Sequence, residues 1–98
     1  MKVIIKQPGQ PAFSQDVSGL SEIESYTGSV VKWFVLPCGM VLLTSKEINE
    51  IDTPFNFLIN GKQIFGSAVF AAFDGINLIG LSEFQEQAVL GYFNFQEN

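Results

Sequence analysis

The fold is decided by the stretch Phe55–Gly80, which runs FNFLINGKQIFGSAVFAAFDGINLIG. It contains three extended apolar runs, joined by Asn60-Gly61 and Asp74-Gly75. Both dipeptides accept positive φ at low cost and are typical of tight turns between antiparallel strands. The stretch therefore predicts an antiparallel sheet, and we expect the rest of the chain to cover the apolar surface of that sheet.

The composition indicates a folded domain rather than a disordered chain. Of the 98 residues, 47% are hydrophobic, only 15% are charged and ten are phenylalanine. A chain of this length suits one domain, so we expect residues 1–98 to form a single domain. The low charge and the many aromatic residues predict either a sheet covered on both faces or an apolar patch left for a partner.

Outside this stretch we expect further strands at Val3–Ile5, Ala12–Val17, Val30–Leu36 and Met40–Thr44, and all but the second are largely apolar runs. The second of these is expected to pair only briefly, at an edge. Both faces of Val30–Leu36 are rich in apolar side chains, so we expect that strand to be central. Pro37-Cys38-Gly39 predicts the tight turn that joins it to the next strand.

Two segments have the spacing of amphipathic helices. In the first, Leu20 and Ile23 follow Ser18, which is expected to cap the helix, and Gly28 suits a left-handed C-terminal stop. The second helix begins at Ser82-Glu83-Phe84-Gln85, which matches a capping box. Its apolar stripe is predicted at Phe84, Ala88, Tyr92 and Phe95, widened by Val89 and Phe93.

These elements predict an α+β fold. We expect an antiparallel sheet of about five to six strands, with the two helices packed on one face of that sheet.

Residues that carry most catalytic chemistry are absent from the sequence. Without His, the usual general base and any Ser–His–Asp arrangement are missing. Cys38 is the single cysteine, with no His to activate it or to complete a zinc site, so we interpret it as structural. The acids between Glu47 and Asp52 lack the spacing and the glycine of a calcium loop. We expect no enzymatic activity, no cofactor and no metal site.

The charge balance limits the classes of partner. The formal net charge is −5, from ten acids against five lysines and no arginine. Nucleic-acid binding relies on Lys and Arg that neutralise phosphates, so we expect neither nucleic acid nor an anionic membrane as a partner. No segment has the length of a membrane span, and the apolar run in Met1–Lys6 is short for a signal peptide. We therefore expect a cytoplasmic location.

Several short motifs together resemble a known family: Met1–Gly9, Pro37-Cys38-Gly39 followed by Val41–Leu43, Pro54-Phe55-Asn56, Asn60–Val69 and the capped helix from Ser82. This layout resembles the small bacterial and phage proteins catalogued as domain of unknown function 3846. That family often has a basic residue where Phe57 stands here. The resemblance implies no activity, cofactor or catalytic residue. Because its members are often encoded on phages and other mobile elements, it implies an accessory or regulatory role.

Two functional hypotheses follow. The first is a non-enzymatic protein-interaction module that binds a protein partner or itself, as a homodimer, because aromatic residues are many and reactive groups few. The alternative is a small-molecule-binding domain or a carboxylate-based enzyme, with a pocket between helix and sheet near Phe55–Gly66. The positions to watch are Asn56, Phe57 and Gly66, with Ser67 as a further polar candidate. For Asn56 a role as turn or cap partner stays open, and for Gly66 a bulge or a close backbone approach.

Overall fold

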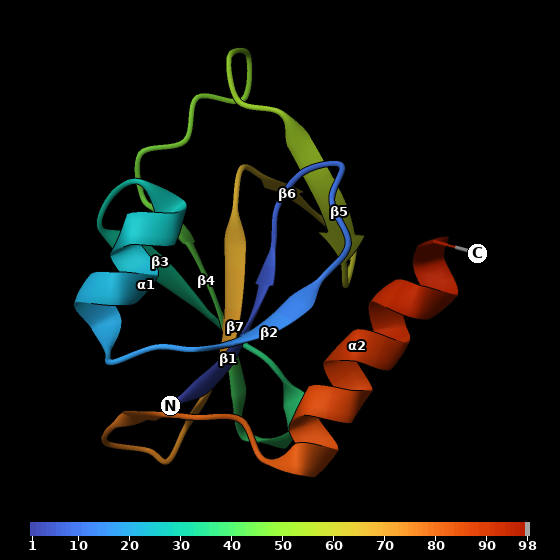
Figure 1. Ribbon diagram of the computed structural model, residues 1–98. Coiled ribbons are helices and arrows are strands. Elements are labelled where there is room, and N and C mark those ends of the chain that lie inside the picture. The colour runs from blue at the N-terminus through green and yellow to red at the C-terminus, as the bar shows by residue number, and fades with distance from the viewer. Residues whose placement is uncertain (98) are drawn as a thin grey trace.

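The computed structural model describes residues 1–97, with the side chains of residues 1–94. Within this range the chain forms eight strands and two α-helices (Figure 1). In chain order they are β1 (Lys2–Lys6), β2 (Phe13–Asp16), α1 (Leu20–Thr27), β3 (Val31–Val35), β4 (Met40–Ser45), β5 (Phe55–Ile59), β6 (Lys62–Phe65), β7 (Ala68–Phe73), β8 (Leu78–Ile79) and α2 (Glu83–Glu97). No helix in residues 1–97 is long and apolar enough to cross a membrane.

Six of these strands form one antiparallel sheet. Its order is β2-β1-β7-β4-β3, and the short β8 also pairs with β7. β7 lies in the middle, where its apolar side chains from Ala68 to Ala72 are all buried. The predicted α+β class with an antiparallel sheet is confirmed.

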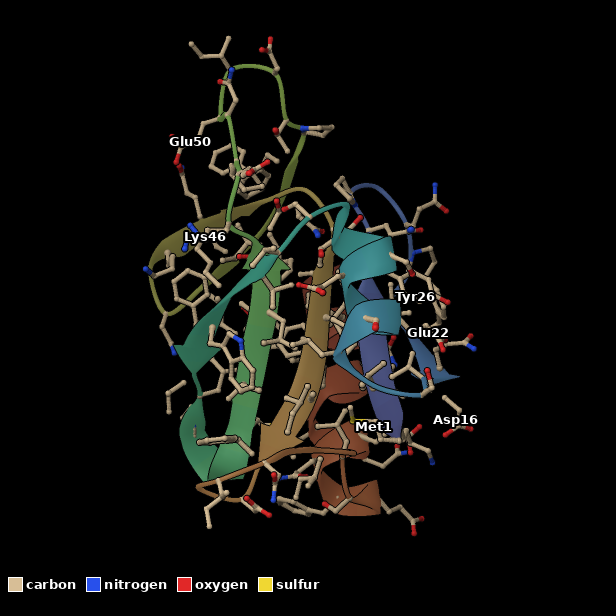
Figure 2. The ribbon with its side chains drawn as sticks, turned by 90° about the vertical axis from the view of Figure 1, so that its left-hand side faces the viewer. Met1, Asp16, Glu22, Tyr26, Lys46 and Glu50 are labelled. Carbon is tan, nitrogen blue, oxygen red and sulfur yellow. The ribbon has the colours of Figure 1, made fainter. Side chains whose placement is uncertain are left out.

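The two helices cover opposite faces of this sheet. Val89 and Phe93 of α2 pack in one core cluster with Ile4 of β1, whereas Ile23 of α1 packs in a second cluster with Ile5 of the same strand. The two helices flank the sheet in Figure 1, and in Figure 2 α1 lies in front of the strands with α2 behind them. The prediction that both helices pack on one face is therefore wrong. Successive side chains of β1, β4 and β7 are apolar toward both faces, so each face needs a cover.

β3 is an edge strand. It pairs with β4 and with no other strand in the described part of the chain, so the prediction of a central strand at Val30–Leu36 is wrong. Val35 is 85% exposed although it is apolar. Apolar side chains on both faces of a strand report what lies above and below it, not whether a second strand lies beside it.

The stretch Phe55–Gly80 divides into two structural units at Gly66. Before it, β5 and β6 form a separate two-stranded sheet closed by the predicted turn, in which Asn60 has φ 50° and Gly61 has φ 76°. After it, the chain enters the centre of the main sheet as β7. The hairpin and α2 both contribute to the core cluster on the Ile4 face of the sheet.

The second predicted turn is longer than a dipeptide. β7 and β8 are joined by four residues, because the pairing of Phe73 with Leu78 leaves Asp74–Asn77 between them. The carboxylate Oδ1 of Asp74 accepts hydrogen bonds from the backbone amides of Ile76 and Asn77 at 2.8 and 2.6 Å. These bonds to the charged form lower the pKa of Asp74, the Asn77 amide having the larger effect.

Most helix ends follow the predictions. Gly28 ends α1 with φ 83°. At the start of α2, the Gln85 amide donates to Ser82 Oγ at 3.1 Å and the Ser82 amide donates to Gln85 Oε1 at 2.8 Å, which confirms the capping box. Ser18 does not cap α1 as predicted, because its amide and hydroxyl both donate to the Glu22 carboxylate instead.

The buried face of α2 is rotated from the predicted stripe. Val89 and Phe93 are buried, whereas Phe84 is 74% exposed and Ala88 is exposed. Phe95 lies outside the residues whose side chains are described. The apolar residues of this helix are spaced so that more than one of its faces is apolar. The path of the chain between β8 and α2 determines which of these faces packs against the sheet.

Candidate functional site

Asn56 ties the β5–β6 hairpin to the main sheet. Its amide nitrogen Nδ2 donates to the carbonyl oxygens of Lys6 and Gly66, both at 2.8 Å. In return, Nζ of the buried Lys6 donates to Asn56 Oδ1 at 3.2 Å and to the carbonyl of Gln7 at 3.0 Å. The polar atoms of Asn56 are thus engaged by the chain itself.

Asn56 occupies this place because β5 has a bulge. Phe55 pairs with Phe65 and Phe57 pairs with Ile64, so Asn56 is an extra residue with no counterpart on β6. A bulge re-aims the side chain of the extra residue, and here the amide reaches β1. The bulge expected near Gly66 therefore lies on the partner strand of the hairpin.

The structure brings two of the predicted site residues together and separates the third. Gly66 has φ 77° and lies within hydrogen-bond distance of Asn56. Phe57 points into the core instead, where its ring centroid lies 5.9 Å from that of Phe70 and 4.9 Å from that of Phe93. Ser67 is half-buried between β6 and β7.

Cys38 lies in the tight turn between β3 and β4, where its φ is 63° and its thiol group is exposed. Its carbonyl accepts a hydrogen bond from Gln85 Nε2 at 2.8 Å, so the turn is tied to the start of α2. Among the described residues, no group of three or more His, Cys, Asp or Glu side chains is placed to hold a metal ion.

Glu86 of α2 is the acid with the most polar partners on this side of the sheet. Its carboxylate accepts a hydrogen bond from the Ser14 hydroxyl and lies 3.2 Å from Nζ of Lys2. The Ser14 hydrogen bond, and after it the Lys2 ammonium, lower the pKa of Glu86. These contacts join β2 and β1 to the first turns of α2.

This geometry predicts an acid-sensitive contribution to stability. Because the pKa of Glu86 is lower in the folded than in the unfolded chain, its contribution is complete above the unfolded value and is lost as the pH falls through the folded value. We expect Glu86→Gln to unfold at a lower urea concentration than the wild type near neutral pH, and the two midpoints to converge between about pH 6 and pH 3. Glu83→Gln is the control, since it removes the same charge from the same helix. If the difference between the urea midpoints of Glu86→Gln and the wild type stays constant across this pH range, the prediction is contradicted.

The edge of β3 is a feature that the sequence analysis missed. Trp33, 41% exposed, and Val35 lie on the face that α1 covers only in part. In Figure 2, α1 lies in front of the right-hand strands, and the teal β3 at the left has no helix in front of it. The available signal was the run of apolar residues at Val30–Leu36, which we assigned to burial.

A cleft of about 420 Å³ lies beside the hairpin. It is bounded by Lys32 and Thr44 of β3 and β4 on one side and by Gly61–Phe65 on the other. This cleft lies between the hairpin and two strands, whereas the predicted pocket was placed near the same stretch but between helix and sheet. A smaller pocket of about 210 Å³ does lie there, lined by residues of α2, of the hairpin and of the β3–β4 connection. The sequence analysis did not single out Thr44, Lys32 or Lys62. No local pattern in the sequence indicates that β3 and β4 lie next to the hairpin.

Comparisons with known proteins add no assignment. No protein-family model, no curated protein and no solved structure matches the chain. The resemblance to domain of unknown function 3846 stays a prediction.

Proposed function

We propose that the chain is a non-enzymatic protein-interaction module that self-associates, and that two copies pair through the open edges of their β3 strands. The observation that supports this most directly is an apolar edge strand whose outward backbone groups pair with no described strand. The resemblance noted above supports an accessory role in the cytoplasm of a cell that carries a mobile element.

The pairing of β3 with β4 determines which backbone groups face outward. The Val30 carbonyl accepts from Lys46 at 2.8 Å and the Leu36 amide donates to Met40 at 2.9 Å. Because hydrogen-bonded and non-hydrogen-bonded pairs alternate in an antiparallel ladder, the even-numbered residues of β3 bond to β4. The amides and carbonyls of the odd-numbered residues Val31, Trp33 and Val35 therefore point to the open edge.

The side chains of these three residues are also suited to an interface. They lie on one face, where Val31 is buried and the indole of Trp33 packs edge-on against Phe73 with centroids 5.5 Å apart. Val35 extends the apolar surface into solvent. A second strand on this edge gains both main-chain hydrogen bonds and apolar contacts, which is the mode of β-strand addition.

The opposite edge of the sheet differs in a way that favours β3. β2 contains Ser14, Gln15 and Asp16 and is only four residues long. Short, charged edge strands resist pairing with other chains. β3 is five residues long, and four of its residues are apolar, whereas Phe13 is the one apolar residue of β2; each strand carries one charge. β3 is therefore the less protected edge by length and polarity.

A twofold axis at Trp33 gives a register without like charges opposite one another. Trp33 then faces Trp33 of the partner subunit, and Val31 faces Val35 of the partner subunit. Lys32 lies opposite Phe34 of the partner subunit, where an ammonium over a ring is favourable. Antiparallel pairing of two copies in this register extends the sheet across both chains.

Sedimentation equilibrium of Val35→Lys tests the proposal. Val35 is exposed, so the variant should fold, but it places a charge on the interface. We expect it to weaken self-association at least about tenfold, or ~1.4 kcal/mol. Ile76→Lys is the matched control, because Ile76 is also 85% exposed but lies in the β7–β8 turn; it should dimerise like the wild type. A wild-type protein that stays monomeric at high concentration contradicts self-association. A dimer that tolerates Val35→Lys contradicts only the β3 interface.

A further inference from the structure

We propose that the cleft between β3, β4 and the β5–β6 hairpin binds a small organic anion, with a carboxylate or phosphate group on a flat apolar body. The cleft, at about 420 Å³, has the volume of a small-ligand site. Its apolar lining comes from Phe34, Ile48, Leu58, Ile64 and Phe65. The cleft shares Lys32 and Phe34 with the proposed β3 pairing, but all of its lining residues come from one chain, so binding does not depend on self-association.

Two ammonium groups are gathered at one aromatic ring in this cleft. Nζ of Lys62 lies 4.4 Å from the centroid of the Phe34 ring, and Nζ of Lys32 lies 5.4 Å from the same centroid. Neither lysine forms an ion pair within the described part of the chain. Glu50 also lines the cleft, which leaves one positive charge in excess. The arrangement favours a ligand with a negative group next to a flat apolar surface.

Thr44 supplies the second, independent observation. It lines the cleft and is only 2% exposed, yet its hydroxyl oxygen has no hydrogen-bond partner among the described residues. A buried hydroxyl without a partner lowers stability. Valine has the same shape and suits a strand at least as well. The unpaired hydroxyl is therefore placed to hydrogen-bond with a group that enters the cleft.

The positions of these residues agree with one ligand. Thr44 pairs directly with Lys32 across the two strands, and both lie on the face covered by the hairpin. An anionic oxygen between them and Lys62 accepts from a hydroxyl and from two ammonium groups. The apolar body of the ligand then lies along Phe34 and the hairpin side chains.

An NMR titration of the ¹⁵N-labelled protein tests the site. The probes are phenyl phosphate and benzoate, with inorganic phosphate as the probe that lacks the apolar body. We expect saturable shifts of the Lys32, Thr44 and Lys62 amides with at least one aromatic anion, and at least about tenfold weaker binding of inorganic phosphate. Which aromatic anion binds more tightly identifies the charged group.

Three variants separate the site from general charge effects. We expect Lys62→Gln to weaken binding of the preferred probe about fivefold and Thr44→Val about tenfold. Thr44→Val should also raise the midpoint of thermal unfolding, which shows that the fold is intact. Lys46→Gln removes the same charge away from the lining residues and should bind like the wild type. Absence of saturable shifts up to millimolar probe, or equal weakening by Lys46→Gln and Lys62→Gln, overturns the proposal. Unchanged binding by Thr44→Val overturns the role of the hydroxyl.

Discussion

Phe93→Ala is expected to lower the free energy of unfolding by about 3–5 kcal/mol, a large part of the stability of a domain of this size. Phe93 is buried, and its ring meets Phe57 and Phe70 edge-on with centroid distances of 4.9 and 5.5 Å. Truncation removes both ring contacts and leaves a cavity where α2, the hairpin and the main sheet meet. Urea unfolding followed by circular dichroism measures the loss.

Phe84→Ala is the matched control on the same helix. Phe84 lies in the first turn of α2 and is mostly exposed, so the same truncation should change the free energy of unfolding by no more than about 0.5 kcal/mol. The pair therefore tests which face of α2 is buried. Equal losses from both variants contradict the packing described above and support the stripe predicted from spacing.

Features that depend on neighbouring residues could be predicted from the sequence. The turn at Asn60-Gly61 requires positive φ at two adjacent residues, and only a few residue types allow this. The capping box at Ser82 and Gln85 and the left-handed stop at Gly28 are likewise local. The strands, the α+β class and most turn positions follow from signals of this kind.

Features that depend on distant parts of the chain could not be predicted from the sequence. The position of β3 at the edge follows from the pairing of β4 with β7 and of β7 with β1, and no residue in Val31–Val35 reports it. The opposite placement of the helices follows from the path of the chain around the sheet. Periodicity shows that a face is apolar, but it does not show which element covers that face.

The candidate sites also combine local features that the sequence shows with long-range contacts that it does not show. Asn56 and Gly66 could be singled out from their neighbours, since an amide in an aromatic run and a glycine within a predicted extended run are unusual. The bond that gives Asn56 its role joins it to Lys6, 50 positions earlier. Thr44 and Lys62 are likewise far apart in sequence, and the cleft between them exists only once the hairpin folds over β3 and β4. A polar site assembled in this way leaves no spacing motif to find.

Gly66→Ala is expected to lower the free energy of unfolding by about 2–4 kcal/mol. The φ of 77° at Gly66 alone accounts for about 1–2 kcal/mol when a Cβ is present. That Cβ also meets Thr53 Cγ2 at 3.1 Å and Ile48 Cδ1 at 3.3 Å. The backbone has little freedom to move away, because the Gly66 amide donates to the Pro54 carbonyl and its own carbonyl accepts from Asn56, both at 2.8 Å.

Gly61→Ala separates the steric part of this effect from the conformational part. Gly61 has nearly the same φ, 76°, but an added Cβ there meets nothing within 4 Å. The loss of unfolding free energy in Gly61→Ala should therefore be about 1–2 kcal/mol, the value for the left-handed backbone alone. Chemical denaturation of both variants under one condition gives the difference, which measures how tightly the 46–54 loop closes over the junction between hairpin and sheet. If the two glycines are equally sensitive, the loop does not press on Gly66 and does not help to hold the hairpin in place.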